Sequence, residues 1–219
     1  MSLAKAYLIL YNNVQLLGWS FILWETAYGL VVSKDASNIY ESVGYAVRLC
    51  QGAALLETVH TAVGLTKGSV PLSFLQWFGR SNVLFLILHS VPELQRHWAV
   101  PVLFIAWALA DICRYPWYAA ALVGTPPKLL TWLRYTAFIP LYPLGIFGGE
   151  MPIIHAGLPY LKDRGLHSLE MPNRFNFAFS YYYFALAGLY FILPVAFLQL
   201  YGYMLRQRSK RLSVRAKNA

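Results

Sequence analysis

Residues 129–160 read LLTWLRYTAFIPLYPLGIFGGEMPIIHAGLPY, a long apolar run that contains one carboxylate, Glu150. A helix needs about 20 mostly apolar residues to cross a bilayer, so this run is long enough to span a membrane. Pro140 and Pro143 lack backbone donors and therefore predict a kink in the helix. Irregular helices at membrane depth are tolerated where they line a cavity, and Tyr142 lies within the predicted kink. The run therefore predicts a membrane helix that carries a polar site.

The rest of the chain has the same character. Polar or turn-forming segments separate five further apolar stretches, which cover approximately residues 6–32, 42–65, 70–91, 98–122 and 175–205. Hydrophobic residues make up 58% of the 219 residues and charged residues only 12%, whereas a soluble domain has about 25% charged residues. This composition excludes disorder and argues against a soluble globule. We predict an all-α, polytopic membrane protein, a bundle of six transmembrane helices around an internal polar cavity, formed by residues 1–205.

The net charge of +9 is concentrated at the C-terminus, where six of the 18 lysines and arginines lie within residues 206–219. Basic segments next to a span stay in the cytosol and favour anionic lipids, although a merely solvated tail explains the same pattern. Because the cluster follows an apolar stretch, nucleic acid is not needed to explain the charge. Six spans put both termini on one side, so we expect residues 206–219 to be a basic cytosolic tail and the N-terminus to be cytosolic as well.

Stretches two to five each carry charged or strongly polar residues inside the apolar run. A charge at the centre of a bilayer costs about 2.5–3.5 kcal/mol on insertion scales, so these side chains are expected to face one another. Hydrogen bonds that join helices, worth about 0.6 kcal/mol each, are the alternative, but they normally use Ser, Thr, Asn and Gln. Carboxylates together with arginines favour an internal cavity lined by Arg48, Glu57, His60, Gln76, Arg80, Asn82, Asp111, Arg114, Arg134, Glu150 and His155.

Several chemistries lack the residues that they need. Glu57 and His60 form one Glu-x-x-His pair, whereas di-iron bundles need two such pairs and two more glutamates, so no metal is expected. Cys50 and Cys113 form no CxxC motif and are expected to be packing thiols. Glycine-rich nucleotide loops and the serine-hydrolase elbow are absent from the sequence. The remaining candidates are a tyrosine–carboxylate acid/base couple and the proton relay of a transporter, and the lack of a repeat between the two halves disfavours the transporter.

Short motifs follow one another from about residue 7 to residue 208. They are Tyr11-Asn12, Gly18-Trp19, Leu56 to His60 with Gly64-Leu65, Gln76 to Arg80, Pro92-Glu93, Trp107, Asp111, Arg114-Tyr115, Trp132 to Tyr135, Leu141 to Gly145, Leu158-Pro159 and Gln207-Arg208. In this order they resemble the very-long-chain (3R)-3-hydroxyacyl-CoA dehydratase family, also described as protein tyrosine phosphatase-like or PASTICCINO 2-type. The family more often has Glu where this chain has Asp111.

The resemblance implies a reaction, a location and partners. It implies a lyase that removes water from a 3-hydroxyacyl-CoA to give trans-2-enoyl-CoA, the third step of fatty acid elongation, in the endoplasmic reticulum membrane and without a cofactor. The acyl chain would enter an apolar tunnel between the spans. Implied partners are membrane lipids and the other elongase subunits, namely the ketoacyl-CoA synthase, the ketoacyl-CoA reductase and the enoyl-CoA reductase. A catalytically inactive lipid-binding scaffold of the elongase complex is the alternative. Residues 215–219, RAKNA, also resemble a dilysine retrieval signal.

Expectations for the site follow from the same resemblance. Tyr142 and Glu150 match the catalytic pair of the family, and we assign Glu150 as the base and Tyr142 as the acid, with the reverse left open. Arg80 and Arg134 are expected to steady the tyrosine or to bind the CoA phosphates. The other expected supporting residues are Glu57 and His60, which would hold the second stretch against the third and fifth, Gln76 beside the thioester, and Gly145.

One departure from the family pattern concerns the spacing of the catalytic pair. The family's glutamate follows the tyrosine by seven residues, whereas Glu150 follows Tyr142 by eight. In a regular α-helix, seven residues return to within about 20° of the same face, and eight miss it by about 80°. A π-bulge absorbs one residue and restores the face, and Gly145, Gly148 and Gly149 tolerate unusual dihedral angles. We therefore predict a π-helical turn between Tyr142 and Glu150.

Overall fold

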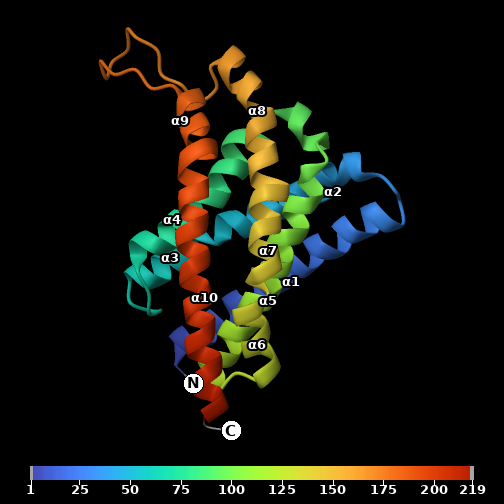
Figure 1. The fold of residues 1–219 in the computed structure, drawn as a ribbon, viewed down its shortest axis with the longest axis vertical. Coiled ribbons are helices and arrows are strands. Elements are labelled where there is room, and N and C mark those ends of the chain that lie inside the picture. The colour runs from blue at the N-terminus through green and yellow to red at the C-terminus, as the bar shows by residue number, and fades with distance from the viewer. Residues whose placement is uncertain (1, 218–219) are drawn as a thin grey trace.

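The protein is helical throughout the part of the chain that the structure, a computed structural model, describes: the backbone of residues 2–217 and the side chains of residues 2–212 (Figure 1). Over these residues it contains no strand, and a single β-bridge joins Leu169 to Phe179 within a loop. The all-α prediction is therefore confirmed. The retrieval signal predicted at residues 215–219 lies outside the residues whose side chains are described.

Four helical runs are long and apolar enough, by length and composition, to cross a membrane. The first is α1 (Leu3–Val31) and the second is α5 (Ala99–Val123). The third, Lys128–Arg164, joins α6 (Lys128–Thr136), α7 (Phe138–Pro143), the π-helical segment η4 (Leu144–Glu150) and α8 (Met151–Arg164). The fourth, Tyr181–Leu212, joins α9 (Tyr181–Ala187), the π-helical segment η5 (Gly188–Ile192) and most of α10 (Leu193–Lys217). These four runs fit a multi-pass membrane protein.

The second and third predicted stretches form broken helices. Helices α2 (Ile39–Ala53) and α3 (Leu55–Ala62) meet at Ala54. Helix α4 (Val70–Ser81) continues directly as the π-helical segment η2 (Asn82–Leu88). Neither stretch is among the four runs that length and hydropathy identify, so the count of six spans stays a prediction. Short 3-10 helices complete the connections, η1 (Ala36–Asn38) and η3 (Pro92–Arg96).

The two ends of the described chain lie at the same end of the molecule. In Figure 1, α1 begins and α10 ends at the bottom of the view, whereas the loop that follows α8 lies at the top. At the loop end, Arg164 at the end of α8 forms an ion pair with Glu93 in η3. This arrangement fits an even number of membrane crossings.

Helix α5 lies at the centre of the packing, with α1 along one side and η4 against another. Most of the fully buried apolar side chains come from α1, α2, α5, η2 and α8, and they include Trp19, Ile22, Val47, Leu84, Leu103, Phe104 and Ile153. Cys50 and Cys113 are free, half-buried thiols, in agreement with the prediction. Because α5 contacts α1, α2, α6, α7 and η4, polar residues on several elements converge on it.

Candidate active site

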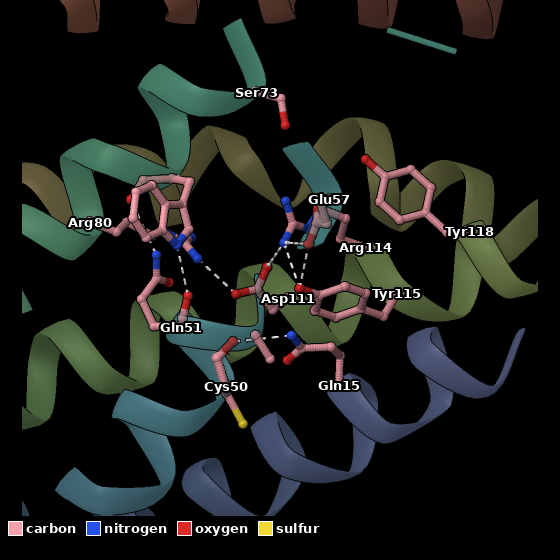
Figure 2. Close-up of polar contacts among 12 residues, drawn as sticks. Gln15, Cys50, Gln51, Glu57, Ser73, Arg80, Asp111, Arg114, Tyr115 and Tyr118 are labelled. Atoms are coloured by element: carbon pink, nitrogen blue, oxygen red, sulfur yellow. Dashed lines mark hydrogen bonds and ion pairs between the residues drawn. The ribbon is translucent and has the colours of Figure 1, made fainter. Parts of the chain in front are cut away.

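Four charged side chains form a continuous chain of ion pairs beside α5 (Figure 2). Asp111 accepts from Arg80 Nη1 through Oδ2 at 2.7 Å and from Arg114 Nη2 through Oδ1 at 2.9 Å. Arg114 Nη2 also lies 3.0 Å from Glu57 Oε1. The Asp111 side chain is only 2% exposed, so two opposite charges beside it offset much of the cost of its burial. The prediction that the charges of these stretches face one another is confirmed for these four residues.

Two tyrosines complete the surroundings of Glu57. Tyr115 donates its hydroxyl hydrogen to Glu57 Oε1 at 2.6 Å, and its oxygen accepts from Arg114 Nη2 at 2.9 Å. The Tyr11 hydroxyl lies 3.5 Å from the same carboxylate oxygen and accepts from Gln15 Nε2 at 3.2 Å. Glu57 is therefore a hydrogen-bonded junction of α1, α3 and α5. Neither tyrosine was expected in the site, although both belong to the motifs quoted above.

His60 lies one turn beyond Glu57 on α3 and is 3% exposed. Its Nε2 is 2.9 Å from the Tyr7 hydroxyl, and its ring meets the Tyr11 ring edge to face at 5.0 Å. The contacts found for Glu57 and His60 join the second stretch to the first and fourth, and the expectation that the pair holds the second stretch against the third and fifth stays a prediction. Residues three apart share one face of a helix, and the contacts of this pair show that their face of α3 is turned toward α1 and α5.

Glu150 is buried against α5, with a side chain only 8% exposed. Its Oε1 accepts a hydrogen bond from Trp107 Nε1 at 3.1 Å. The Trp107 ring in turn lies under the Arg80 guanidinium, whose central carbon is 5.2 Å from the ring centroid. Trp107 belongs to the quoted motifs, but its contact with Glu150 was not predicted, because helical periodicity does not show which helix faces which.

Tyr142 is half-buried and stacks on α10. Its ring lies 5.4 Å from the Phe197 ring at an interplanar angle of 13°, and Tyr201 continues the stack. Glu150, Trp107 and Arg80 therefore form one neighbourhood between α4, α5 and the third run, and Tyr142 faces α10 from the same run.

The segment between Tyr142 and Glu150 is π-helical, because η4 covers Leu144–Glu150. The predicted π-helical turn is confirmed, but the expected role of its glycines needs correction. Positive φ occurs at none of the three glycines of η4. A Cβ atom at Gly149 would lie 3.0 Å from Leu103 Cα, and one at Gly148 would lie 3.1 Å from Val102 Cγ1, whereas one at Gly145 would meet Ala106 Cβ at an ordinary 3.6 Å. Gly148 and Gly149 therefore let η4 approach α5 closely, and the freedom of the three glycines in φ is not used.

Two expected supporting residues lie apart from this neighbourhood. Arg134 on α6 donates from Nη2 to the Tyr118 hydroxyl at 3.1 Å, and its guanidinium lies over the Tyr118 ring. Gln76 is exposed on α4, and no hydrogen bond joins its side chain to another residue of the described chain. Three or more His, Cys, Asp or Glu side chains that could hold a metal ion do not come together within the part of the chain that is described.

Comparisons with known proteins confirm the resemblance carried by the motifs. A sequence profile of the family described as "Protein tyrosine phosphatase-like protein, PTPLA" matches residues 51–214. The human protein named "Very-long-chain (3R)-3-hydroxyacyl-CoA dehydratase 2" is 40% identical over 215 residues, which cover 96% of this chain and 82% of that protein. No solved structure matches the chain.

Relatives from distant organisms match this chain over nearly the whole length of both proteins. The Caenorhabditis elegans "Very-long-chain (3R)-3-hydroxyacyl-CoA dehydratase hpo-8" is 37% identical, over 95% of each chain. The Arabidopsis thaliana "Very-long-chain (3R)-3-hydroxyacyl-CoA dehydratase PASTICCINO 2" is 34% identical, over 95% of this chain and 94% of that protein. The chain therefore belongs to the protein tyrosine phosphatase-like family, among whose members are proteins named very-long-chain (3R)-3-hydroxyacyl-CoA dehydratases.

Proposed function

We propose that this protein is a very-long-chain (3R)-3-hydroxyacyl-CoA dehydratase with Tyr142 and Glu150 as its catalytic pair. The observation that carries the proposal is the π-helical segment η4 between them. An extra residue in a regular helix would turn Glu150 away by about 80°. A π-helical segment absorbs the extra residue and would return Glu150 to the face of Tyr142. The similarity to curated dehydratases over 95–96% of the chain supplies the reaction.

The elimination needs one group that removes a proton from C2 and another that protonates the leaving hydroxyl at C3. The thioester carbonyl acidifies the C2–H bond, and the Glu150 carboxylate takes this proton. The electron pair of the broken C–H bond forms the C2=C3 double bond, and the C3–O bond breaks. Tyr142 gives its phenolic proton to the departing oxygen, which leaves as water. A proton then returns from Glu150 to the Tyr142 phenolate, which restores the enzyme.

The buried charges support this pair from a distance. Asp111 holds Arg80 at 2.7 Å, and the Arg80 guanidinium favours the phenolate form of Tyr142 during the reaction. Glu57 and Arg114 continue the chain of ion pairs to α3 and keep α3, α4 and α5 together, while His60 joins α3 to α1. Gly145 faces Ala106 of α5, where a Cβ atom would make an ordinary contact, so its supporting role stays a prediction. The remaining candidates for contacts with the CoA portion are Arg134 and Gln76.

The membrane arrangement that suits this function has six spans within residues 1–205. The broken helices α2–α3 and α4–η2 would supply the two spans beyond the four identified by length and hydropathy. An even number of spans agrees with the shared end of α1 and α10 in Figure 1. The basic tail, residues 206–219, would then be cytosolic together with the N-terminus. An internal polar cavity and an apolar tunnel between the spans would hold the reacting carbons and the acyl chain.

We also propose a cellular location and partners for the reaction. We place the protein in the endoplasmic reticulum membrane, among membrane lipids and the elongase subunits that make and consume its substrate and product. These subunits are the ketoacyl-CoA synthase, the ketoacyl-CoA reductase and the enoyl-CoA reductase. No separate cofactor is needed, because acid and base both come from side chains.

The test is turnover by the purified protein in detergent micelles. A long-chain (3R)-3-hydroxyacyl-CoA should be converted to the trans-2-enoyl-CoA, measured by mass spectrometry, and the (3S) isomer should react far more slowly. Tyr142→Phe should lose about 100-fold or more of the rate, the usual scale of general acid catalysis. Tyr183→Phe, at an exposed tyrosine of α9, is the matched control and should keep full activity. Substrate binding without turnover by the wild type would favour the inactive scaffold and overturn the proposal.

A further inference from the structure

Trp107 connects the chain of ion pairs to the carboxylate of Glu150. Its indole Nε1 donates to Glu150 Oε1 at 3.1 Å, and the Arg80 guanidinium lies 5.2 Å from its ring centroid. Trp107 is 2% exposed and Glu150 is 8% exposed. Both ends of the hydrogen bond are therefore shielded from water, which would otherwise compete for donor and acceptor.

The indole N–H is the only hydrogen-bond donor to the Glu150 carboxylate among the described residues. The terminal torsion of a glutamate side chain is broad and approximately two-fold, so it is poorly fixed without a partner. One directional donor therefore decides where the second carboxylate oxygen points. A donor of this kind also favours the ionised form of the carboxylate, which is the form that a general base needs.

The orientation of the indole is itself fixed by the neighbouring turn of α5. Trp107 and Asp111 are four residues apart on α5 and so share one face of the helix. Asp111 holds Arg80 at 2.7 Å, and Arg80 lies over the Trp107 ring, in the geometry of a cation–π contact. The contacts thus run from Asp111 through Arg80 and Trp107 to Glu150.

We infer that Trp107 is a positioning residue for the dehydration, which aims the Glu150 carboxylate at the substrate through its indole N–H. The inference rests on the proposed function and deepens it, because it gives the base a dedicated partner. The Trp107 side chain does not itself touch the reacting atoms. Its removal should therefore impair the chemical step far more than it impairs substrate binding.

Two substitutions at position 107 distinguish the effect of losing the indole N–H from the effect of losing ring volume. Trp107→Phe removes the donor together with part of the ring. Incorporation of 3-benzothienylalanine at position 107 replaces the N–H by sulfur and keeps the bicyclic shape, so it tests the donor where Trp107→Phe folds poorly. Trp117→Phe is the matched control, because Trp117 lies on the same helix and donates to the Thr131 hydroxyl at 3.3 Å. All variants are purified as the full chain, and melting curves report their folding.

The assay measures kcat, KM and the dependence of kcat on pH for each variant. Loss of a hydrogen bond to a charged group should lower kcat about 10- to 100-fold in both position-107 variants, with KM changed less than about threefold. The acidic limb of the pH profile should move to higher pH, because a carboxylate that has lost its donor ionises less readily. Trp117→Phe should match the wild type.

A wild-type kcat and pH profile in the benzothienylalanine variant would overturn the inference, because the ring alone would then suffice. Wild-type turnover in Glu150→Gln would instead overturn the assignment of Glu150 as the base, and an absence of turnover in the wild type would overturn the proposed function. Each result is read from a different protein, so the failures are distinguishable.

Discussion

The Tyr201 hydroxyl on α10 donates a hydrogen bond to the backbone carbonyl of Ile139 at 3.3 Å. In a regular helix that carbonyl would accept from the N–H of residue 143, but Pro143 has none. An unpaired backbone group at membrane depth is costly, so α10 supplies the partner that the sequence of the third run removes. The same tyrosine belongs to the aromatic stack with Phe197 and Tyr142. The fourth run therefore both repairs the break in the third run and positions the ring of Tyr142.

Tyr201→Phe should lower the free energy of unfolding by about 1 kcal/mol, the lower end of the cost of leaving a shielded acceptor unpaired, because the hydrogen bond is only partly buried. The stack itself should survive, because the ring is retained. Thermal unfolding in detergent micelles measures the change. Tyr190→Phe, at an exposed tyrosine of η5, should leave the melting temperature unaltered; an equal loss in both variants would contradict the role given to the hydroxyl.

Gly149→Ala should destabilise the protein by about 1–3 kcal/mol, the range for overpacking of a tight core. A Cβ atom there would lie 2.8 Å from Leu103 Cδ1 and 3.0 Å from Leu103 Cα, so η4 would have to move away from α5. Gly202→Ala on α10 is the control, since nothing lies within 4 Å of a Cβ atom at that position. That variant should be neutral or slightly more stable, because alanine is the better helix former. Unaltered stability of Gly149→Ala would show that the η4–α5 contact is looser than described.

Asp111→Asn should cost about 3 kcal/mol, because it breaks a buried pair and leaves two arginines short of a negative charge. Asp111→Glu keeps the charge and should lose much less. Asp163→Asn, at an exposed position near the end of α8, is the matched control and should leave stability nearly unaltered. Melting temperatures of the three variants check the order. Equal stability of Asp111→Asn and the wild type would mean that the ion pairs of Figure 2 contribute little.

The ion pair of Glu93 and Arg164 should make the loop end of the molecule sensitive to acid. Hydrogen bonds from Arg164 hold the pKa of Glu93 below its usual range. A carboxyl whose folded-state pKa is depressed contributes stability above its unfolded-state pKa of about 4.3, and the contribution disappears as the pH falls through the folded-state pKa. The melting-temperature difference between the wild type and Arg164→Gln should therefore be full at about pH 7 and should shrink as the pH falls below the unfolded-state pKa of Glu93. Because the pair is exposed, the difference at neutral pH should also shrink in high salt.

The outline of the fold and part of the site were predictable from local pattern. Hydrophobic stretches and their polar breaks gave the helices, and the cost of charge in a membrane predicted that Glu57, Arg80, Asp111 and Arg114 would meet. The irregular spacing of Tyr142 and Glu150 predicted the π-helical turn. Each of these inferences depends on distances along one chain segment or on a general energetic penalty.

What could not be predicted is the arrangement of the helices around one another. Periodicity tells which residues share a face but not which helix that face meets, so the contacts of Glu57 and His60 with α1 and α5 were not predicted. The contact of Trp107 with Glu150 was missed for the same reason. The packing role of Gly149 was not predicted either. The sequence does not distinguish a glycine that is needed for close helix packing from one that is needed for an unusual φ.

The central claim is that Glu150 works with Tyr142 across the π-helical segment. The most direct measurement is the rate at which purified Glu150→Gln converts a long-chain (3R)-3-hydroxyacyl-CoA, compared with the wild type under the same conditions. We predict that the wild type turns over and that the variant loses about 100-fold or more of kcat while it still binds substrate, because the amide cannot accept the C2 proton. Equal turnover in both proteins would contradict the claim and direct attention to Glu57 or Asp111 as the base.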